Sequence, residues 1–291
     1  MSIRTILAAA GTSAACEGTI DLACRLASRF GSHVEGFHVL VDPRAVFAAA
    51  GEGFGMPIAG SLIDSILEEA KAGAAKAKAL FETVAARYAL PHRGVAQLAE
   101  PRELGPSVAW REETGHAPDL VAQRARFFDL AVLGRSDRVV REPHSTTIEE
   151  TLAQAGRPVL LAPVDAPASV GYVVAIAWNG SPQAVRALAA SLPFLASATT
   201  VTVLTVGDAD EAGSLWVVDY LAWHKVKAEH RAVAPQRGQA VGQRLLDTAR
   251  ELGADLLVMG AYGHAAWREF VFGGATREIV GLETMPLLLM H

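Results

Sequence analysis

The sequence predicts an α/β protein made of two tandem, doubly wound parallel-sheet (Rossmann-like) domains. Short continuous runs of Val, Ile, Leu and Ala alternate with helix-length amphipathic segments. Such runs, without polar alternation, are typical of parallel strands that helices cover on both faces. The same landmarks then recur in the same order in each half of the 291 residues, which indicates a tandem duplication.

Three pairs of segments carry the repeat. They are ILAAAGTS at 6–13 with VAIAWNGS at 174–181, FDLAVLG at 128–134 with ADLLVMG at 254–260, and RPVLLAP at 157–163 with MPLLLMH at 285–291. Residues 163–169, rich in proline and small side chains, read as the linker. We therefore expect domains at residues 1–165 and 170–291.

The first half reads as five strands with intervening helices. Its expected strands are 4–9, 33–41, 108–113, 130–134 and 159–162. Its expected helices are 13–30, 61–88, 118–126 and 148–154. The small-residue segment 42–60 is interpreted as a mobile lid or an interface arm.

The second half repeats this alternation. Its expected strands are 171–177, 200–206, 227–232, 256–260 and 287–290, and its expected helices are 182–195, 214–223, 239–252 and 276–282. Ser181 directly precedes a helix and is interpreted as its N-cap. The strands that follow Arg157 and Met285 also suggest sheet pairing, either between the halves or between protomers.

Composition narrows the function classes. The hydrophobic fraction is 51%, yet no uninterrupted apolar run reaches the roughly 18–20 residues of a membrane span. The start of the chain lacks the layout of a signal peptide. A net charge of −5 argues against a general nucleic-acid binder. Cys16 and Cys24 share one predicted helix without metal-ligand spacing, so we expect packed, reduced thiols in a cytoplasmic protein.

The candidate site lies where the first and fourth strands of the second half end. In doubly wound sheets, ligands bind outside the carboxyl ends of the strands, where the strand order reverses. Asn179 follows the first strand, and a loop with Gly260, Gly263, Gly273 and Gly274 follows the fourth. Glycines there allow close backbone approach and positive φ, and the next helix would point its N-terminus at an anion.

These residues resemble the universal stress protein family. That family carries Gly-x2-Gly-x9-Gly followed by Ser or Thr after its fourth strand, and Gly260, Gly263 and Gly273 keep the spacing. Gly274 stands where the hydroxyl residue is expected, and Thr276 lies two residues later. Asn179 stands where nucleotide-binding relatives carry an acidic residue. In those relatives the acidic side chain contacts the nucleotide, and it is a candidate Mg²⁺ ligand. The first half resembles a degenerate copy, with Ala10 at the acid position.

The resemblance implies ATP or another adenine nucleotide, with or without Mg²⁺, as a regulatory ligand of the second half. The expected binding residues are Ala177, Trp178, Asn179, Val206, Gly260, Gly263, Gly273, Gly274, Ala275 and Thr276. Neither a Walker lysine nor a convincing general base accompanies them, so we assign no catalytic residue and expect at most slow ATP hydrolysis. We assign no metal ligand of the protein itself.

Two other interpretations remain open. The glycine loop is also explained as a turn that packs a helix on the sheet, with Thr276 as a helix cap. The function is then that of a nucleotide-independent stress-related interaction protein of the same fold. In either case we expect a homodimer formed through a sheet edge or domain pairing, with regulatory protein partners and neither nucleic acid nor membrane.

Overall fold

The computed structural model contains two compact units. Arg4–Ala155 form the N-terminal unit, and Gly156–His291 form the C-terminal unit together with the first residues of the chain. The structure describes residues 2–13, 15–42, 56–94, 105–135, 144–164, 167–207, 211–236, 238–261 and 285–291. Within these ranges, no helix is long and apolar enough to cross a membrane.

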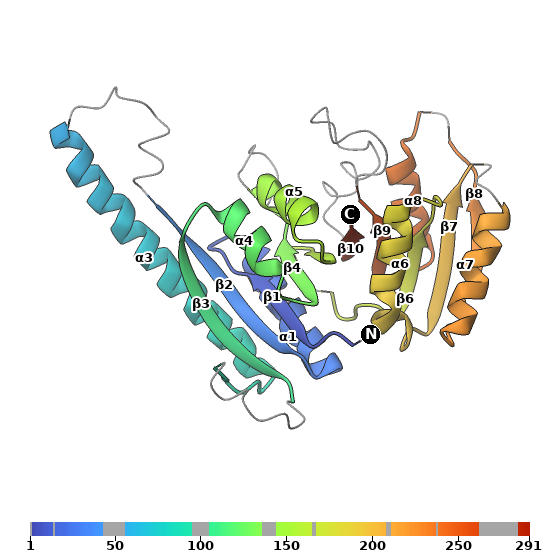
Figure 1. Cartoon of the computed structure of the whole chain (residues 1–291), viewed down its shortest axis with the longest axis horizontal. Helices are drawn as coiled ribbons and strands as arrows, with labels where there is room; N and C mark the ends of the chain where they lie inside the picture. Colours follow the sequence, from blue (N-terminus) through green and yellow to red (C-terminus); the bar gives the residue numbers. More distant parts are fainter. Residues whose placement is uncertain are drawn as a thin grey trace. The chain divides into compact units, whose positions relative to one another are not determined.

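The N-terminal unit is a parallel sheet of order β3-β2-β1-β4 (Figure 1). Its strands are β1 (Thr5–Ala9), β2 (His33–Val41), β3 (Ser107–Gly115) and β4 (Leu130–Gly134). Its helices are α1 (Ala15–Phe30), α3 (Met56–Arg87), α4 (Ala117–Ala125) and α5 (His144–Gln154). Contacts pair α1 with α3 and α4 with α5, as expected when the crossover direction reverses after β3.

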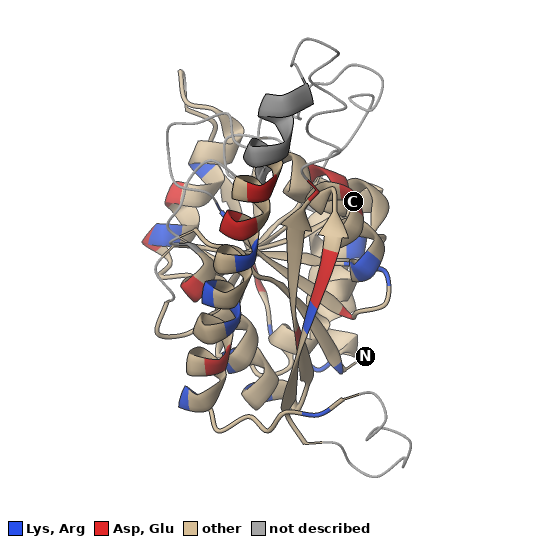
Figure 2. Cartoon of the chain, turned by 90° about the vertical axis from the view of Figure 1, so that its left-hand side faces the viewer, with Lys and Arg blue, Asp and Glu red and all other residues tan. Residues whose placement is uncertain are grey.

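The segment predicted as a loop up to residue 60 is partly helical. α3 already begins at Met56, with Pro57 in its first turn, where a missing N–H costs no helix bond. Residues 43–55 lie outside the described residues. The outer surface of this unit carries charges of both signs along α3 and β3, as Figure 2 shows from the β3–α3 side. Charged side chains on an edge strand disfavour pairing with another sheet.

The C-terminal unit repeats the arrangement, with parallel strands in the order β10-β9-β6-β7-β8. Its strands are β6 (Val173–Ala177), β7 (Thr200–Val206), β8 (Glu229–Val233), β9 (Leu256–Gly260) and β10 (Leu287–Met290). Its helices are α6 (Pro182–Leu195), α7 (Glu211–Trp223) and α8 (Val241–Glu251). The predicted helix at 276–282 lies outside the described residues.

One strand of this unit comes from before the linker. β5 (Val159–Ala162) is fully buried and pairs antiparallel with β10, joining Leu287 to Leu161 and Leu289 to Val159. The pairing suggested for the strands after Arg157 and Met285 is thus confirmed, and it occurs within the chain. β10 has β5 on one side and β9 on the other, so neither of its edges is free.

The duplicated Asp-Leu landmark has a structural cause. The Asp255 carboxylate accepts hydrogen bonds from the backbone N–H groups of Gly171 (2.9 Å), Tyr172 (2.9 Å) and Val173 (3.0 Å). Asp129 accepts in the same way from the N–H groups of Arg4 (2.8 Å) and Thr5 (3.1 Å). Each Asp therefore ties the start of its unit's first strand to the start of its fourth.

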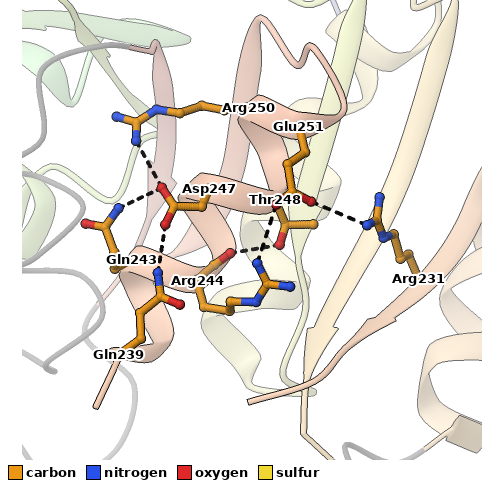
Figure 3. Close-up of polar contacts among 8 residues, drawn as sticks. All are labelled: Arg231, Gln239, Gln243, Arg244, Asp247, Thr248, Arg250 and Glu251. Atoms are coloured by element: carbon orange, nitrogen blue, oxygen red, sulfur yellow. Dashed lines mark hydrogen bonds and ion pairs between the residues drawn. The ribbon is translucent and has the colours of Figure 1, made fainter. Parts of the chain in front are cut away.

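α8 is an outer helix of the C-terminal unit with a polar exposed side. Its exposed side carries a network of charged and amide groups, centred on Asp247 and Glu251 (Figure 3). Asp247 accepts from Gln239 (2.7 Å), Gln243 (2.8 Å) and Arg250 (3.1 Å), while Glu251 pairs with Arg231 of β8 (3.5 Å). Polar groups thus face outward, while residues such as Leu246 face the sheet and are fully buried.

Candidate functional site

The carboxyl ends of β6, β7 and β9 meet at one edge of the C-terminal sheet. Ala177 at the end of β6 pairs with Leu204 of β7 on one side and with Met259 of β9 on the other. The N–H of Trp178 extends the ladder by donating to the Leu204 carbonyl at 2.8 Å. Strand order reverses between β6 and β9, so Ala177, Trp178 and Gly260 flank the position where ligands of doubly wound sheets bind.

The turn after β6 is held by its own side chains. The Ser181 N–H donates to Asn179 Oδ1 at 3.1 Å, and Gly180 adopts a left-handed φ of 72°. Ser181 Oγ then accepts from the Ala184 N–H at 3.2 Å, which confirms Ser181 as the N-cap of α6. The side-chain oxygen of Asn179 is therefore engaged in the turn, and the residue as a whole is exposed.

Gly260 has a steric role that differs from the one predicted. It does not adopt a positive φ. Instead, a Cβ at this position would lie 2.5 Å from the Ala184 nitrogen and 2.6 Å from the Gln183 carbonyl carbon. Only glycine lets the first turn of α6 approach the end of β9 this closely. The positive φ expected at Gly260 is not observed, and the expected approach of an anion to its backbone stays a prediction.

The remaining predicted residues divide into two groups. Val206 ends β7, is half-buried, and pairs with Val233 of β8. The following Gly207 has a φ of 84° and donates its N–H to the Val233 carbonyl at 3.1 Å. The other group lies outside the described residues and consists of Gly263, Gly273, Gly274, Ala275 and Thr276.

A cavity of about 500 Å³ adjoins the turn after β6. The turn residues Trp178, Asn179 and Gly180 form one wall, and side chains of α6 and α7 form the others. The helix residues are Val185, Leu188, Gly213, Ser214, Trp216, Val217 and Tyr220. Among the residues that the structure describes, the lining is mostly apolar and aromatic and includes no charged side chain, so this part of the cavity suits a neutral ring more than a phosphate. Sequence reasoning missed this cavity, because the packing of α6 beside α7 sets it.

Known proteins resemble this chain in structure and not in sequence. No protein-family model matches the sequence, and no curated protein matches it. A universal stress protein from Archaeoglobus fulgidus DSM 4304 has a similar structure, with a TM-score of 0.71 at 12% identity over 99% of this chain and 96% of that one. A functionally unknown protein from Pseudomonas aeruginosa PAO1 gives a TM-score of 0.56 at 14% identity, covering 99% of this chain and 92% of that one.

The chain has the tandem universal stress protein fold. The likeness to the Archaeoglobus fulgidus protein spans both units, so the predicted fold and its duplication are confirmed. Each copy of the universal stress protein fold here places the end of its first strand beside its fourth strand.

The equivalent turn of the N-terminal copy of this fold is closed by its own chain. The Ala10 N–H donates to the Phe37 carbonyl at 2.8 Å, as Trp178 does to Leu204. Ala10 therefore corresponds to Trp178, and the counterpart of Asn179 is Gly11, which corrects the sequence assignment of Ala10. The Ala10 carbonyl accepts from His38 Nδ1 at 2.8 Å, and the Gly11 N–H donates to Cys16 Sγ at 3.2 Å.

Burial shifts the pKa values of Cys16, Cys24 and His291. Burial raises the pKa of the Cys24 thiol to about 12, with the nearby Asp21 carboxylate adding to the effect. Burial also raises the pKa of Cys16, so both thiols are packed and protonated near neutral pH, as the sequence predicted. At the end of β10, burial and the positive charge of Arg186 lower the pKa of His291, which favours its neutral imidazole.

Proposed function

We propose that the chain is a universal stress response protein whose C-terminal unit binds an adenine nucleotide (ATP, ADP or AMP) as a regulatory ligand. The observation that carries the proposal is the position of Gly260. It directly follows Met259, the partner of Ala177, at the reversal of strand order, and it opens the sequence spacing Gly260-x2-Gly263-x9-Gly273. The fold, shared at full length with a universal stress protein, supports the same site.

The residues at the strand ends suit binding better than chemistry. We assign the base or the ribose to Trp178, the exposed Asn179 and Val206, which lie where β6 and β7 end. Phosphates are assigned to the loop with Gly263, Gly273, Gly274, Ala275 and Thr276. Ala177, Trp178, Asn179, Val206 and Gly260 offer no general base, so we propose a regulatory and not a catalytic ligand.

Magnesium would arrive with the nucleotide. Asn179 offers an amide where a carboxylate would hold Mg²⁺ more strongly, and its carbonyl oxygen already accepts from Ser181. Within the described ranges, no group of three His, Cys, Asp or Glu side chains could hold a metal ion. We place the protein in the cytoplasm, with its regulatory signal read by protein partners.

Isothermal titration of the full chain with ATP and ADP, with and without Mg²⁺, tests this proposal. We expect heat of binding in the micromolar range, lost in Gly263→Val and Gly273→Val and kept in Gly11→Ala of the other unit. Circular dichroism melts would show that each variant is folded. Absence of binding heat in the wild-type chain at high-micromolar nucleotide would refute it.

The second candidate function is a nucleotide-independent interaction protein of the same fold. It is favoured by the engaged Asn179 carbonyl oxygen and by the uncharged lining of the adjacent cavity. Mass spectrometry of the purified native protein separates the two candidates. Stoichiometric adenine nucleotide released on denaturation would count against this second function, and its absence together with silent titrations would favour it.

A further inference from the structure

The outer face of α7 is apolar and exposed. Leu215 is 59% exposed, Trp216 70%, Tyr220 37% and Trp223 87%, while Leu221 on the opposite side is fully buried. α7 lies against β7 and β8 at the outer side of the unit (Figure 1). Large side chains gathered on one exposed face mark an interaction surface. The ion-paired face of α8 shows that an outer helix of this unit need not be built this way.

The exposed residues form one stripe along the helix. Trp216, Tyr220 and Trp223 follow the i, i+4, i+7 spacing that places side chains on a single helical face. Asp219 adds a carboxylate beside Tyr220, and it makes no hydrogen bond or ion pair with any residue that the structure describes. The Tyr220 ring packs on His224 with centroids 4.6 Å apart, so this side chain has a neighbour on its own helix.

This stripe is complementary to itself. The pattern Trp216-x-x-Asp219-Tyr220-x-x-Trp223 has an aromatic residue at each end and an acceptor–donor pair in the middle. When two such helices pack antiparallel about a twofold axis between positions 219 and 220, Trp216 meets Trp223 of the partner subunit. Asp219 then meets Tyr220 of the partner subunit, whose hydroxyl can donate to the carboxylate. Twofold symmetry repeats both contacts.

We propose that Trp216, Asp219, Tyr220 and Trp223 form a self-association surface through which two copies of this chain pair their α7 helices antiparallel. A twofold contact uses the same patch on both subunits and closes at a dimer. This surface is separate from the sheet, where β10 already has a strand on both sides. Trp216 and Tyr220 also line the cavity beside the turn after β6, whereas Asp219 and Trp223 do not, and the proposal requires no bound nucleotide.

The exposed area of the stripe determines how tightly we expect the two copies to associate. Aromatic side chains contribute on the order of 150–250 Å² each when covered, and a standard interface buries about 800 Å² per partner. The partly exposed rings of Trp216, Tyr220 and Trp223 supply about half of that area. A reversible, concentration-dependent dimer follows, dominated by the two tryptophans, which are among the side chains that most often carry binding energy.

Sedimentation velocity of the full chain over a wide range of concentrations tests the proposal. The wild-type chain should shift from monomer to dimer, and Trp216→Ala and Trp223→Ala should each weaken the dimer by about tenfold or more. Tyr172→Ala removes another exposed aromatic residue of the same unit and should leave the dimer unchanged. All three positions are exposed, so each variant should keep the wild-type melting temperature.

The polar centre and the helix orientation have their own tests. Tyr220→Lys places an ammonium group against Asp219 of the partner subunit, so its dimer should survive and become salt-sensitive, whereas Asp219→Lys should dissociate it. For orientation, an equimolar mixture of Trp216→Cys and Trp223→Cys should form an oxidised dimer that neither variant forms alone. The native Cys16 and Cys24 are buried and do not compete.

The outcomes separate the possible occupants of this face. A wild-type chain that stays monomeric at every concentration overturns the proposal and leaves the stripe to a different protein. A dimer that both tryptophan substitutions leave intact also overturns it and places the contact elsewhere. Disulfide formation in the single variants alone would contradict the antiparallel arrangement.

Discussion

The turns after the first strand of the two units begin alike and end differently. Ala10 and Trp178 each extend the strand ladder through one N–H, to Phe37 and Leu204. Beyond that point the N-terminal turn satisfies its backbone internally through His38 and Cys16. The C-terminal turn is held by the side chains of Asn179 and Ser181, and it also borders a cavity.

The difference shows which parts of a duplicated fold are free to change. The hydrogen bonds that hold the first strand to its neighbours are kept in both copies, including those of Asp129 and Asp255. The residues that follow the ladder have diverged: Gly11 and Thr12 stand where the C-terminal turn has Asn179 and Gly180. We infer that the strand scaffold was retained in both units while the turns that follow the first strand diverged.

The largest expected effect is a loss of stability of the C-terminal unit when Gly260 is substituted. Gly260→Ala forces a Cβ against the backbone of Gln183 and Ala184 and should lower the unfolding free energy of the C-terminal unit by about 3 kcal/mol. Gly11→Ala, in the other turn, meets no atom within 4 Å and should change it by less than about 0.5 kcal/mol. Differential scanning calorimetry measures both, and equal shifts in melting temperature would contradict the steric role.

The two aspartates test whether the units are held independently. Asp129→Ala and Asp255→Ala each leave strand-initiating N–H groups without their carboxylate acceptor, at a cost of about 2 kcal/mol. Cys16 and Cys24 both lie in the N-terminal unit, so their labelling by a thiol reagent reports opening of that unit alone. Asp129→Ala should accelerate labelling and Asp255→Ala should not. Equal acceleration would show that the units open together.

A smaller effect is expected from an acid in the turn. Asn179→Asp keeps an oxygen for the Ser181 N–H and adds a possible Mg²⁺ ligand. Titration with ATP should then show an affinity ratio, with over without Mg²⁺, about three- to tenfold higher than in the wild-type chain. Gly11→Asp is the matched change in the N-terminal turn. If it alters the ratio equally, nucleotide is not confined to the C-terminal turn.

The smallest effect is a pH dependence in the N-terminal unit. Burial lowers the pKa of His33, an effect opposed by Glu35 and reinforced by Arg93. The folded pKa therefore lies below the unfolded value of about 6.5, so the unfolded chain binds the proton first. Stability contributed by neutral His33 is present above that pH and declines as the pH falls below it. Urea titrations on both sides of this pH should show a decline that His33→Asn reduces, and an unchanged decline would exclude His33 as its source.

Local sequence patterns predicted many of the strands and helices. Short runs of apolar and β-branched residues predicted β4, β5, β7, β9 and β10 with their observed bounds, because strands buried by helices or neighbouring strands carry such runs. α5 begins at His144, earlier than predicted, since its first turn is polar and gives no apolar period. Whether β5 would meet β10 within the chain or between protomers depended on long-range topology that no local pattern carries.

The candidate site was predictable only in part. Spacing and strand context gave Ala177, Trp178 and Gly260 a common edge, because parallel strands in one sheet end on the same side. The reason for Gly260 was not predictable, since the close approach of α6 is a tertiary contact. The repeated Asp before Leu130 and Leu256 was visible in the sequence and could have been read as a shared strand anchor. The exposure of Trp216 and Trp223 on α7 depends on tertiary packing and is seen only in the structure.

The pairing of β5 with β10 also means that β5 is synthesised well before the strand that covers it. Val159–Ala162 leaves the ribosome long before Leu287–Met290, and all four of its residues are apolar and buried in the finished molecule. Until β10 emerges, the apolar strand β5 lacks the neighbouring strand that covers one of its edges, and it is prone to aggregate. Nascent chains stalled between these two strands should therefore be the ones that chaperones hold longest.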